Sequence, residues 1–299
     1  MGLPEVFCCP WACCVTLNYC LANWRKSPMG TRKPAVAGQF YPGSPNELRR
    51  TVEQCLAISG QEAAPESVAA IVAPHAGYVY SGSTAGFAYA RVRGKRPGRI
   101  VLMGCSHRHA IGTASVAMYD AYETPIGALP ADRAFAERLA SECHSVSDEP
   151  HHYEHSLEVQ LPFIQIAIGA VPVVPVLFGG PPGEWHIRFG ERLAELIGPS
   201  DLIVASTDLS HYLREEQAHQ VDKHTMDVLL TQDCARFAKA LAGDSCSMCG
   251  GAAVVAAMAC ALKRGAREWS VLDYRTSAEM SGDYSRVVGY AAISMESEP

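Results

Sequence analysis

The sequence has 299 residues and a formal net charge of −6; 48% of its residues are hydrophobic and 19% are charged. This balance is typical of a globular protein, and the lack of a basic stripe argues against nucleic acid or an anionic membrane as the main partner. No apolar run is long enough to span a bilayer, and the length suits one large domain or two smaller ones.

Residues 1–28 differ from the rest of the chain. Five of the twelve cysteines lie among the first 20 residues, and the segment lacks the basic start and the small-residue cleavage site of a signal peptide. Met29 then opens a stretch typical of a natural N-terminus. We therefore expect 1–28 to be a disordered Cys-rich extension or the product of a start codon placed too early, and 29–299 to form the domain. The other cysteines show no disulfide framework, which predicts a reducing cytoplasm.

Four apolar, β-branched runs alternate with amphipathic stretches along the chain. We expect strands at 68–73, 99–104, 171–178 and 202–206, and helices at about 45–58, 83–92, 131–142, 155–169, 183–197 and 216–231. A helix rich in small residues follows at 250–266, and strands at 269–275 and 285–294 end the chain. Near-continuous apolar strands between helices predict a single α/β domain with a mostly parallel central sheet flanked by helices.

Histidines follow three of the first four predicted strands. His75 comes two residues after the first strand, His107 three residues after the second, and His211 five residues after the fourth. The carboxyl ends of parallel strands meet at one edge of a sheet, where ligands bind. A single histidine there is usually a loop residue, but three together favour a shared site, and imidazoles suit zinc, iron, copper or nickel.

Cys249 offers a fourth candidate ligand. It precedes Gly250 and Gly251 at the start of the predicted small-residue helix, and a thiol at a helix N-terminus has a lowered pKa that suits a metal ligand or a nucleophile. Cys246 forms a C-x-x-C pair with it. One such pair is weak support for structural zinc, so we expect Cys246 to be a buried small residue.

The densest polar cluster spans 148–163. His155 and Glu158 stand three residues apart on one face of a predicted helix, where they form either a wall of the site or a solvated first turn. His151 and His152 are expected at the surface. The sequence has no nucleotide-binding glycine motif, no H-E-x-x-H and no G-x-S-x-G. A protease with Cys249 and a histidine is conceivable, but it leaves the other strand-end histidines without a role.

The chain resembles the Memo-like family in seven stretches that follow one another: KPAVAGQFYPG, VAPHAGYVYSG, GCSHRH, YETPIG, EHSLEVQLPF, STDLSHY and CGGAAV. Bacterial members are often called AmmeMemoRadiSam system protein B. The resemblance runs from about Arg32 to the C-terminus. It implies a fold like that of class III, LigB-type extradiol dioxygenases, which hold non-haem Fe(II) with two histidines and a carboxylate.

By this resemblance, His75 and His107 match the two histidine ligands, and Cys249 matches the third position, where the dioxygenases have a glutamate. His211 matches the acid–base histidine, with Asp208 in the same motif. Four further residues are expected to line the cleft or support the site: His155, Glu158, Phe40 and Tyr80. Phe40 stands where the animal Memo protein has a tryptophan implicated in ligand binding, so phosphopeptide binding is not carried over.

Three functions remain open. The first is an oxidoreductase that binds Fe(II), with copper or zinc as alternatives, takes a small molecule or peptide in its cleft, and uses His211 to move protons. The second is a binding or scaffold module that kept the cleft but lost the chemistry. The third is a metal-handling protein without turnover. The family name also implies a partnership with a radical SAM protein and an AMMECR-like protein.

Overall fold

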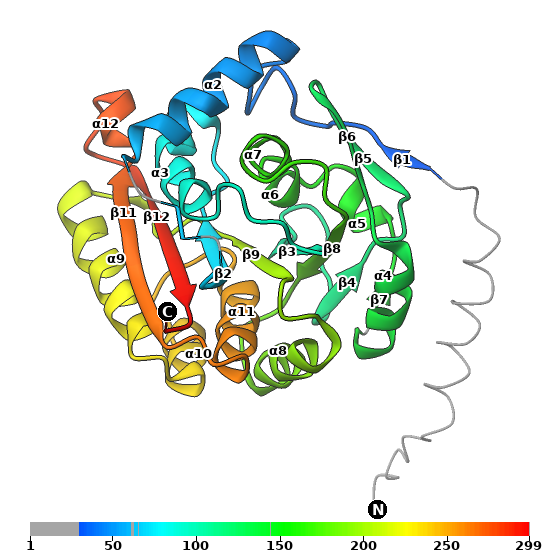
Figure 1. Cartoon of the computed structure of the whole chain (residues 1–299). Helices are drawn as coiled ribbons and strands as arrows, with labels where there is room; N and C mark the ends of the chain where they lie inside the picture. The colour runs from blue at the N-terminus through cyan, green and yellow to red at the C-terminus, as the bar shows by residue number, and fades with distance from the viewer. Residues whose placement is uncertain (1–29, 61–62, 65, 144, 299) are drawn as a thin grey trace, which may run out of the picture. The chain divides into compact units, whose positions relative to one another are not determined.

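The computed structural model describes residues 30–60, 63–64, 66–143 and 145–298, and from Thr31 onward the chain forms one α/β domain (Figure 1). The expectation for 1–28 falls outside these residues. The strands that centre the sheet are β2 (Val68–Ala73), β3 (Ile100–Cys105), β8 (Val173–Phe178), β9 (Leu202–Ser206), β11 (Glu268–Thr276) and β12 (Val287–Glu296). Their positions agree with the predicted strands to within two residues at each end.

The helices of the described residues follow the predicted amphipathic stretches, with some additions. They are α2 (Pro45–Ile58), α3 (Tyr78–Arg91), α4 (Arg133–Leu139), the 3-10 turn η1 (Ala140–Glu142), α5 (Glu149–His152), α6 (His155–Glu158), α7 (Leu161–Ala167), α8 (Glu184–Leu196), α9 (Glu215–Leu230), α10 (Cys234–Ala242), α11 (Gly251–Lys263) and α12 (Ala278–Ser281). The short strands β1 (Thr31–Arg32), β4 (Ala114–Val116), β5 (Ala121–Thr124), β6 (Gly127–Pro130), β7 (Ser145–Val146) and β10 (His211–Leu213) were not predicted. Most are too short to carry an alternating pattern.

The large sheet among these residues has nine strands in the order β10-β12-β2-β9-β3-β8-β4-β7, with β11 beside β12. Its central strands β2, β9, β3 and β8 are all parallel, which confirms the predicted parallel core. Antiparallel strands extend it on both sides, β12 beside β2 and β4 beside β8. A separate small sheet joins β1, β5 and β6. The sheet is therefore mixed, with the parallel part at its centre.

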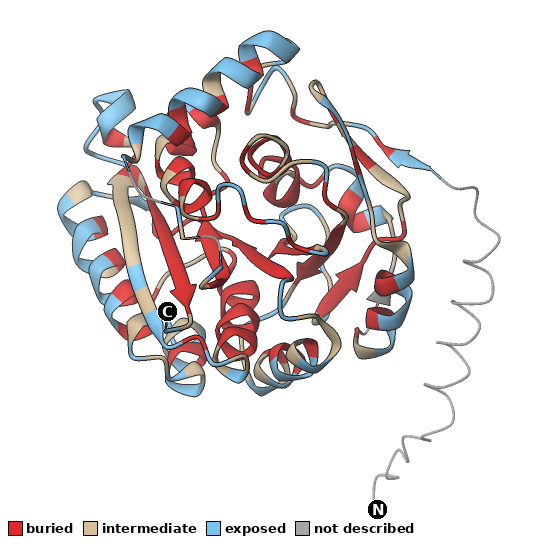
Figure 2. Ribbon diagram, in the orientation of Figure 1, coloured by how far each residue is buried: buried red, intermediate tan, exposed pale blue. Residues whose placement is uncertain are grey.

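Helices cover both faces of the sheet, as near-continuous apolar strands require. α3 packs against β2 and β12, whereas α11 packs against β2, β9 and β3 from the other face (Figure 1). The central strands are buried along their whole length (Figure 2). Small residues let α8 and α11 approach closely, because a Cβ on Gly190 would lie 2.1 Å from the carbonyl oxygen of Ala256. The strands thus form a rigid base for the residues at their ends.

The predicted helix 155–169 is wrong as a single element. α6 ends at Glu158 and α7 begins at Leu161, with Pro162 in the first turn of α7. A proline inside a helix lacks an N–H and its ring clashes with the carbonyl four residues earlier, so the apolar spacing continues across a break in the backbone. The segment at the break turns toward the strand ends.

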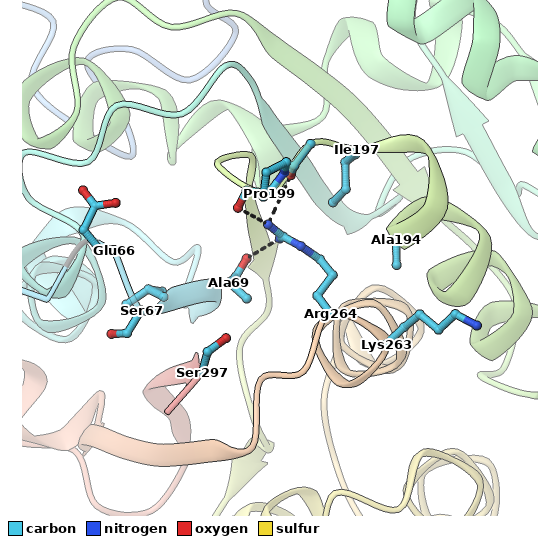
Figure 3. A pocket seen from close by; sticks show the side chains of 11 residues that line it. Glu66, Ser67, Ala69, Ala194, Ile197, Pro199, Lys263, Arg264 and Ser297 are labelled. Atoms are coloured by element: carbon cyan, nitrogen blue, oxygen red, sulfur yellow. Dashed lines mark hydrogen bonds between the residues drawn. The ribbon is translucent and has the colours of Figure 1, made fainter. Parts of the chain in front are cut away.

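The opposite edge of the sheet, where β2 begins, holds a cavity of about 450 Å³ (Figure 3). Arg264 crosses it and donates hydrogen bonds to the carbonyl oxygens of Ala69, Gly198 and Pro199 at 3.4, 3.2 and 2.7 Å. The guanidinium ties the end of α11 to the start of β2 and to the loop between α8 and β9. In this cavity Arg264 holds backbone carbonyls in place, and the candidate ligands lie at the other edge of the sheet.

Candidate metal centre

Three neighbouring parallel strands end at the same edge of the sheet, and each delivers side chains to one cluster. His75 follows β2, Cys105 ends β3 and is followed by His107, and Ser206 ends β9, which lies between them. Cys249 enters from the loop before α11. The candidate ligand atoms of His75, Cys105, His107 and Cys249 all lie within 4.8 Å of one another. The predicted convergence of strand-end histidines therefore holds for two of the three.

Close backbone contacts place the Cys249 thiol beside His75. The Cys249 N–H donates to the Asp208 carbonyl oxygen at 3.2 Å, and the Asp208 N–H donates back to the Cys249 Sγ at 3.2 Å. The Sγ lies 3.2 Å from His75 Nε2. A Cβ on Gly250 would lie 2.4 Å from the Ser206 carbonyl oxygen, so only glycine lets the loop come this close to β9.

The electrostatics of the cluster favour a thiolate at Cys249. A hydrogen bond from Cys105, together with the positive charge of His75 and hydrogen bonds from His107 and His75, holds the pKa of the Cys249 thiol well below its usual value, although burial opposes this. The same hydrogen bond, followed by burial, raises the pKa of Cys105 well above its usual value. The thiolate is the form that binds metals, so the cluster is prepared for a cation.

A chain of hydrogen bonds fixes which nitrogen of His75 faces the cluster. Ser206 uses its single proton on the Ser156 carbonyl oxygen at 2.6 Å and accepts from Gln160 Nε2 at 2.8 Å. Its oxygen lies 3.0 Å from His75 Nδ1, which must therefore donate. That leaves Nε2, the atom beside the Cys249 Sγ, as the ligand atom.

His107 is oriented by a carboxylate. Its Nδ1 donates to Glu154 Oε1 at 2.8 Å, and its backbone N–H donates to Glu154 Oε2 at 2.6 Å. Burial works to raise the pKa of Glu154, but the contacts with His107 outweigh it and lower the pKa to about 2. His107 Nε2 then faces the Cys105 Sγ at 3.5 Å. A carboxylate behind a histidine is the usual support of a metal ligand.

Both imidazoles are held in a strongly anionic setting. Burial lowers the pKa of His75, but the charges of Cys249 and Asp208 raise it to about 9. Burial likewise lowers the pKa of His107, and hydrogen bonds to Cys249 and Glu154 raise it to about 10. Protons on these rings balance the thiolate. A metal cation would take their place and release them.

His155 and Phe40, both predicted to line the site, form a wall next to His107. The rings of His107 and His155 stack with centroids 4.4 Å apart, and Phe40 packs against His155 at 4.7 Å. Burial, followed by the charge of His75, lowers the pKa of His155 to about 4. This ring is therefore neutral near pH 7.

Asp208 and His211 follow β9, Asp208 in the loop and His211 at the start of β10. Asp208 Oδ1 accepts the His75 N–H at 2.7 Å, and its Oδ2 lies 4.0 Å from His75 Nε2. Burial raises the pKa of Asp208, and the charges of His75 and His211 oppose this. Tyr212 has a φ of 62° at a bulge in β10, a conformation that costs energy for a non-glycine residue and re-aims its neighbours.

A family model described as Memo-like protein matches residues 32–294. The chain belongs to the Memo-like family. MEMO1 family proteins of Methanopyrus kandleri and Methanosarcina barkeri are each 36% identical to it, over 88% and 89% of this chain and 98% and 100% of theirs. That of Aquifex aeolicus is 37% identical over 89% of this chain and 99% of its own.

Among solved structures, an uncharacterized protein from Escherichia coli K12 matches with 17% identity and a TM-score of 0.46, over 67% of this chain and 86% of that one. A likeness at this level carries no argument. Within the described part of this Memo-like protein, no helix combines the length and the apolar character needed to cross a membrane.

Two residues predicted at the site of this Memo-like protein lie apart from its cluster. Glu158 accepts hydrogen bonds from Arg32, from the Val36 N–H at 2.9 Å and from the Tyr41 hydroxyl at 2.6 Å. It therefore holds the segment 32–41 in place. Tyr80 on α3 is 43% exposed and is not among the residues of the cluster.

The prediction that His151 lies at the surface is wrong, whereas His152 is exposed as expected. His151 is 2% exposed, and its Nε2 donates to the Ser115 carbonyl oxygen at 3.1 Å. Burial is the main reason why its pKa is lowered to about 3. Cys246 is buried, which confirms the prediction for it.

Sequence reasoning did not select Cys105 and Ser206, and it included Glu154 only as one candidate of the polar cluster 148–163, without a role. Cys105 and Ser206 are the last residues of β3 and β9, so the strand-end rule that found the histidines also applies to them. Glu154 precedes α6 and caps it by accepting from the Ser156 N–H at 2.9 Å. Its second role, orienting His107, depends on a contact 47 residues away in the chain.

Proposed function

We propose that this Memo-like protein binds a transition-metal ion through His75 Nε2, His107 Nε2 and Cys249 Sγ. The observation that carries this proposal is the convergence of these atoms while both Nδ1 atoms are held by hydrogen bonds that point away from the cluster. Two imidazoles and a thiolate suit iron, copper or zinc, and they disfavour magnesium and calcium.

We propose further that the ion is redox-active, Fe(II) or copper, and serves an oxidation related to that of LigB-type extradiol dioxygenases. An ion held here would supply Lewis acidity and electron transfer. His211, half-buried and within the field of Asp208, would hold or move a proton of the substrate. The neutral wall of His155 and Phe40 would orient a small molecule or a peptide.

A second candidate is a metal-handling or binding module without turnover. The thiolate where the dioxygenases have a carboxylate favours it, and so does the second thiol of Cys105 in the cluster. In either case we place the protein in the cytoplasm, in partnership with a radical SAM protein and an AMMECR-like protein as the bacterial family name implies. The support for a reducing compartment is that all the described cysteines are free.

Metal analysis after anaerobic purification tests the first proposal. We expect one ion per chain in the parent and in Cys246→Ser, and its loss in Cys249→Ser and His75→Ala. Equal metal affinity of the parent and Cys249→Ser would contradict the metal centre.

Oxygen consumption with candidate phenols then separates the two functions. In the oxidoreductase, His211→Ala keeps the metal stoichiometry and loses turnover. A parent that holds its ion but consumes no oxygen with any phenol supports the metal-handling module.

A further inference from the structure

Cys105 places a second sulfur in the cluster. It ends β3, is 9% exposed, and its Sγ lies 3.5 Å from His107 Nε2. Its Sγ also lies within 4.8 Å of the Cys249 Sγ. The proposed ligand set of two histidines and one cysteine therefore leaves out a fourth donor that meets the same distance limit of 4.8 Å.

Two sulfur–nitrogen distances in the cluster lie close to those of a tetrahedral site. For metal–sulfur bonds of about 2.3 Å and metal–nitrogen bonds of about 2.0–2.1 Å, a sulfur and a nitrogen on one tetrahedron lie about 3.6 Å apart. The Cys249 Sγ lies 3.2 Å from His75 Nε2, and the Cys105 Sγ lies 3.5 Å from His107 Nε2 and 3.9 Å from its Nδ1. Each histidine thus has one sulfur partner at nearly the right separation.

We propose that Cys105 is a fourth metal ligand, so that the ion is held by two cysteines and two histidines. This inference rests on the proposed metal centre and specifies which ion it takes. Two thiolates shift the preference toward Zn²⁺ and Cu⁺ and away from ions that favour oxygen ligands. Four protein ligands also leave no open position on a four-coordinate ion, so chemistry at the ion requires Cys105 to dissociate.

The surface offers a route to the two sulfurs. Cys105 and Cys249 line a cavity of about 300 Å³ between the turn after β8 and the loop before α11. The cavity is also lined by Cys246, which lies outside the four-residue cluster. Cys246 is therefore a matched control, because it is a cysteine in the same cavity that the proposal leaves without a role.

The test is a titration of the full chain with Co²⁺ and with Zn²⁺ under anaerobic conditions. Thiolate-to-cobalt absorption in the near ultraviolet counts the sulfur ligands, and X-ray absorption of the zinc form counts them independently. We expect two sulfurs in the parent and in Cys246→Ser, and one in Cys105→Ser and Cys105→Ala. Loss of an outer partner of a ligand already costs roughly 10–100-fold in affinity, so the two Cys105 variants should bind Zn²⁺ at least tenfold more weakly.

The outcomes distinguish failure of the fourth ligand, Cys105, from failure of the three-ligand metal centre. One sulfur in the parent, or an unchanged spectrum and Zn²⁺ affinity in both Cys105 variants, overturns the fourth ligand while leaving the His75, His107 and Cys249 centre in place. A parent that binds neither ion overturns both proposals. Thermal unfolding of the metal-free variants shows whether they fold like the parent, and the two substitutions, one polar and one apolar, must agree.

Discussion

Glu154→Gln is the sharpest test of how the site is supported, because Glu154 hydrogen-bonds to the candidate ligand His107 and lies outside the four-residue cluster. Three N–H groups donate to its carboxylate. Oε1 accepts from His107 Nδ1 at 2.8 Å and from the Ser156 N–H at 2.9 Å, while Oε2 accepts from the His107 N–H at 2.6 Å. A glutamine has one oxygen and one NH₂ group, so in either orientation the NH₂ meets an N–H.

The expected loss follows from that mismatch. If the amide oxygen faces His107 Nδ1, the backbone N–H of His107 is left without its acceptor, and the reverse orientation frees the imidazole to turn. Supporting residues of this kind typically change metal affinity about 10–100-fold, which is about 1.4–2.7 kcal/mol. The negative charge that raises the pKa of His107 is also lost, so protons compete less with the ion there and the effect should lie toward the lower end.

Competition with a chromophoric chelator at fixed pH measures this change for Zn²⁺ and Co²⁺. The stoichiometry should stay at one ion per chain, since His75, His107 and Cys249 are all retained. A Glu154→Gln protein that binds with the parent's affinity would refute the view that this carboxylate orients His107. Glu158→Gln is the matched control, because it makes the same chemical change four residues away without touching a candidate ligand.

Two further predictions concern stability. Glu158→Gln should lower the free energy of unfolding by about 3–5 kcal/mol in denaturant titrations, because it removes the buried partner of Arg32, while metal stoichiometry stays the same. His151→Gln should weaken the acid sensitivity of the fold. The pKa of His151 is about 3 in the folded state and 6.5 ordinarily, so the unfolded chain binds the extra proton and stability is lost as the pH falls through this window. Between pH 7 and 5 the loss from this group is about 2 kcal/mol. The variant should lack it and the exposed-site control His152→Gln should retain it; equal slopes in both would contradict the buried neutral ring.

The sequence was sufficient to predict the parallel core and its functional edge, for a physical reason. Strands buried on both faces read as continuous apolar runs, so β2, β3, β8 and β9 could be located to within two residues. Parallel strands end at one edge, which brings His75 and His107 together without knowledge of strand order. Cys249 could be found because two glycines follow it, and the close approach of Gly250 to β9 explains why glycine is needed.

What could not be predicted depends on contacts between distant segments. Glu154 and Glu158 have the same chemistry and lie one turn apart, yet one supports His107 and the other binds Arg32 and Tyr41. Helical spacing cannot separate them, because the choice is made by what packs against each side chain. His151 looked like a surface residue because polar residues surround it in the sequence, although the fold buries it against β4.

The break between α6 and α7, which spacing alone concealed, is what allows one short segment to orient both imidazoles. Before the break, Glu154 binds His107 Nδ1. In α6 the Ser156 carbonyl accepts from Ser206, and at the break Gln160 donates to the same hydroxyl, which fixes the proton on His75 Nδ1. A continuous helix from 155 to 169 would commit the Ser156 carbonyl to a hydrogen bond with the Gln160 N–H. It would also spread successive side chains around the helix axis. Pro162 disfavours that helix, so the residue that breaks the secondary structure also allows this segment to hold both imidazoles.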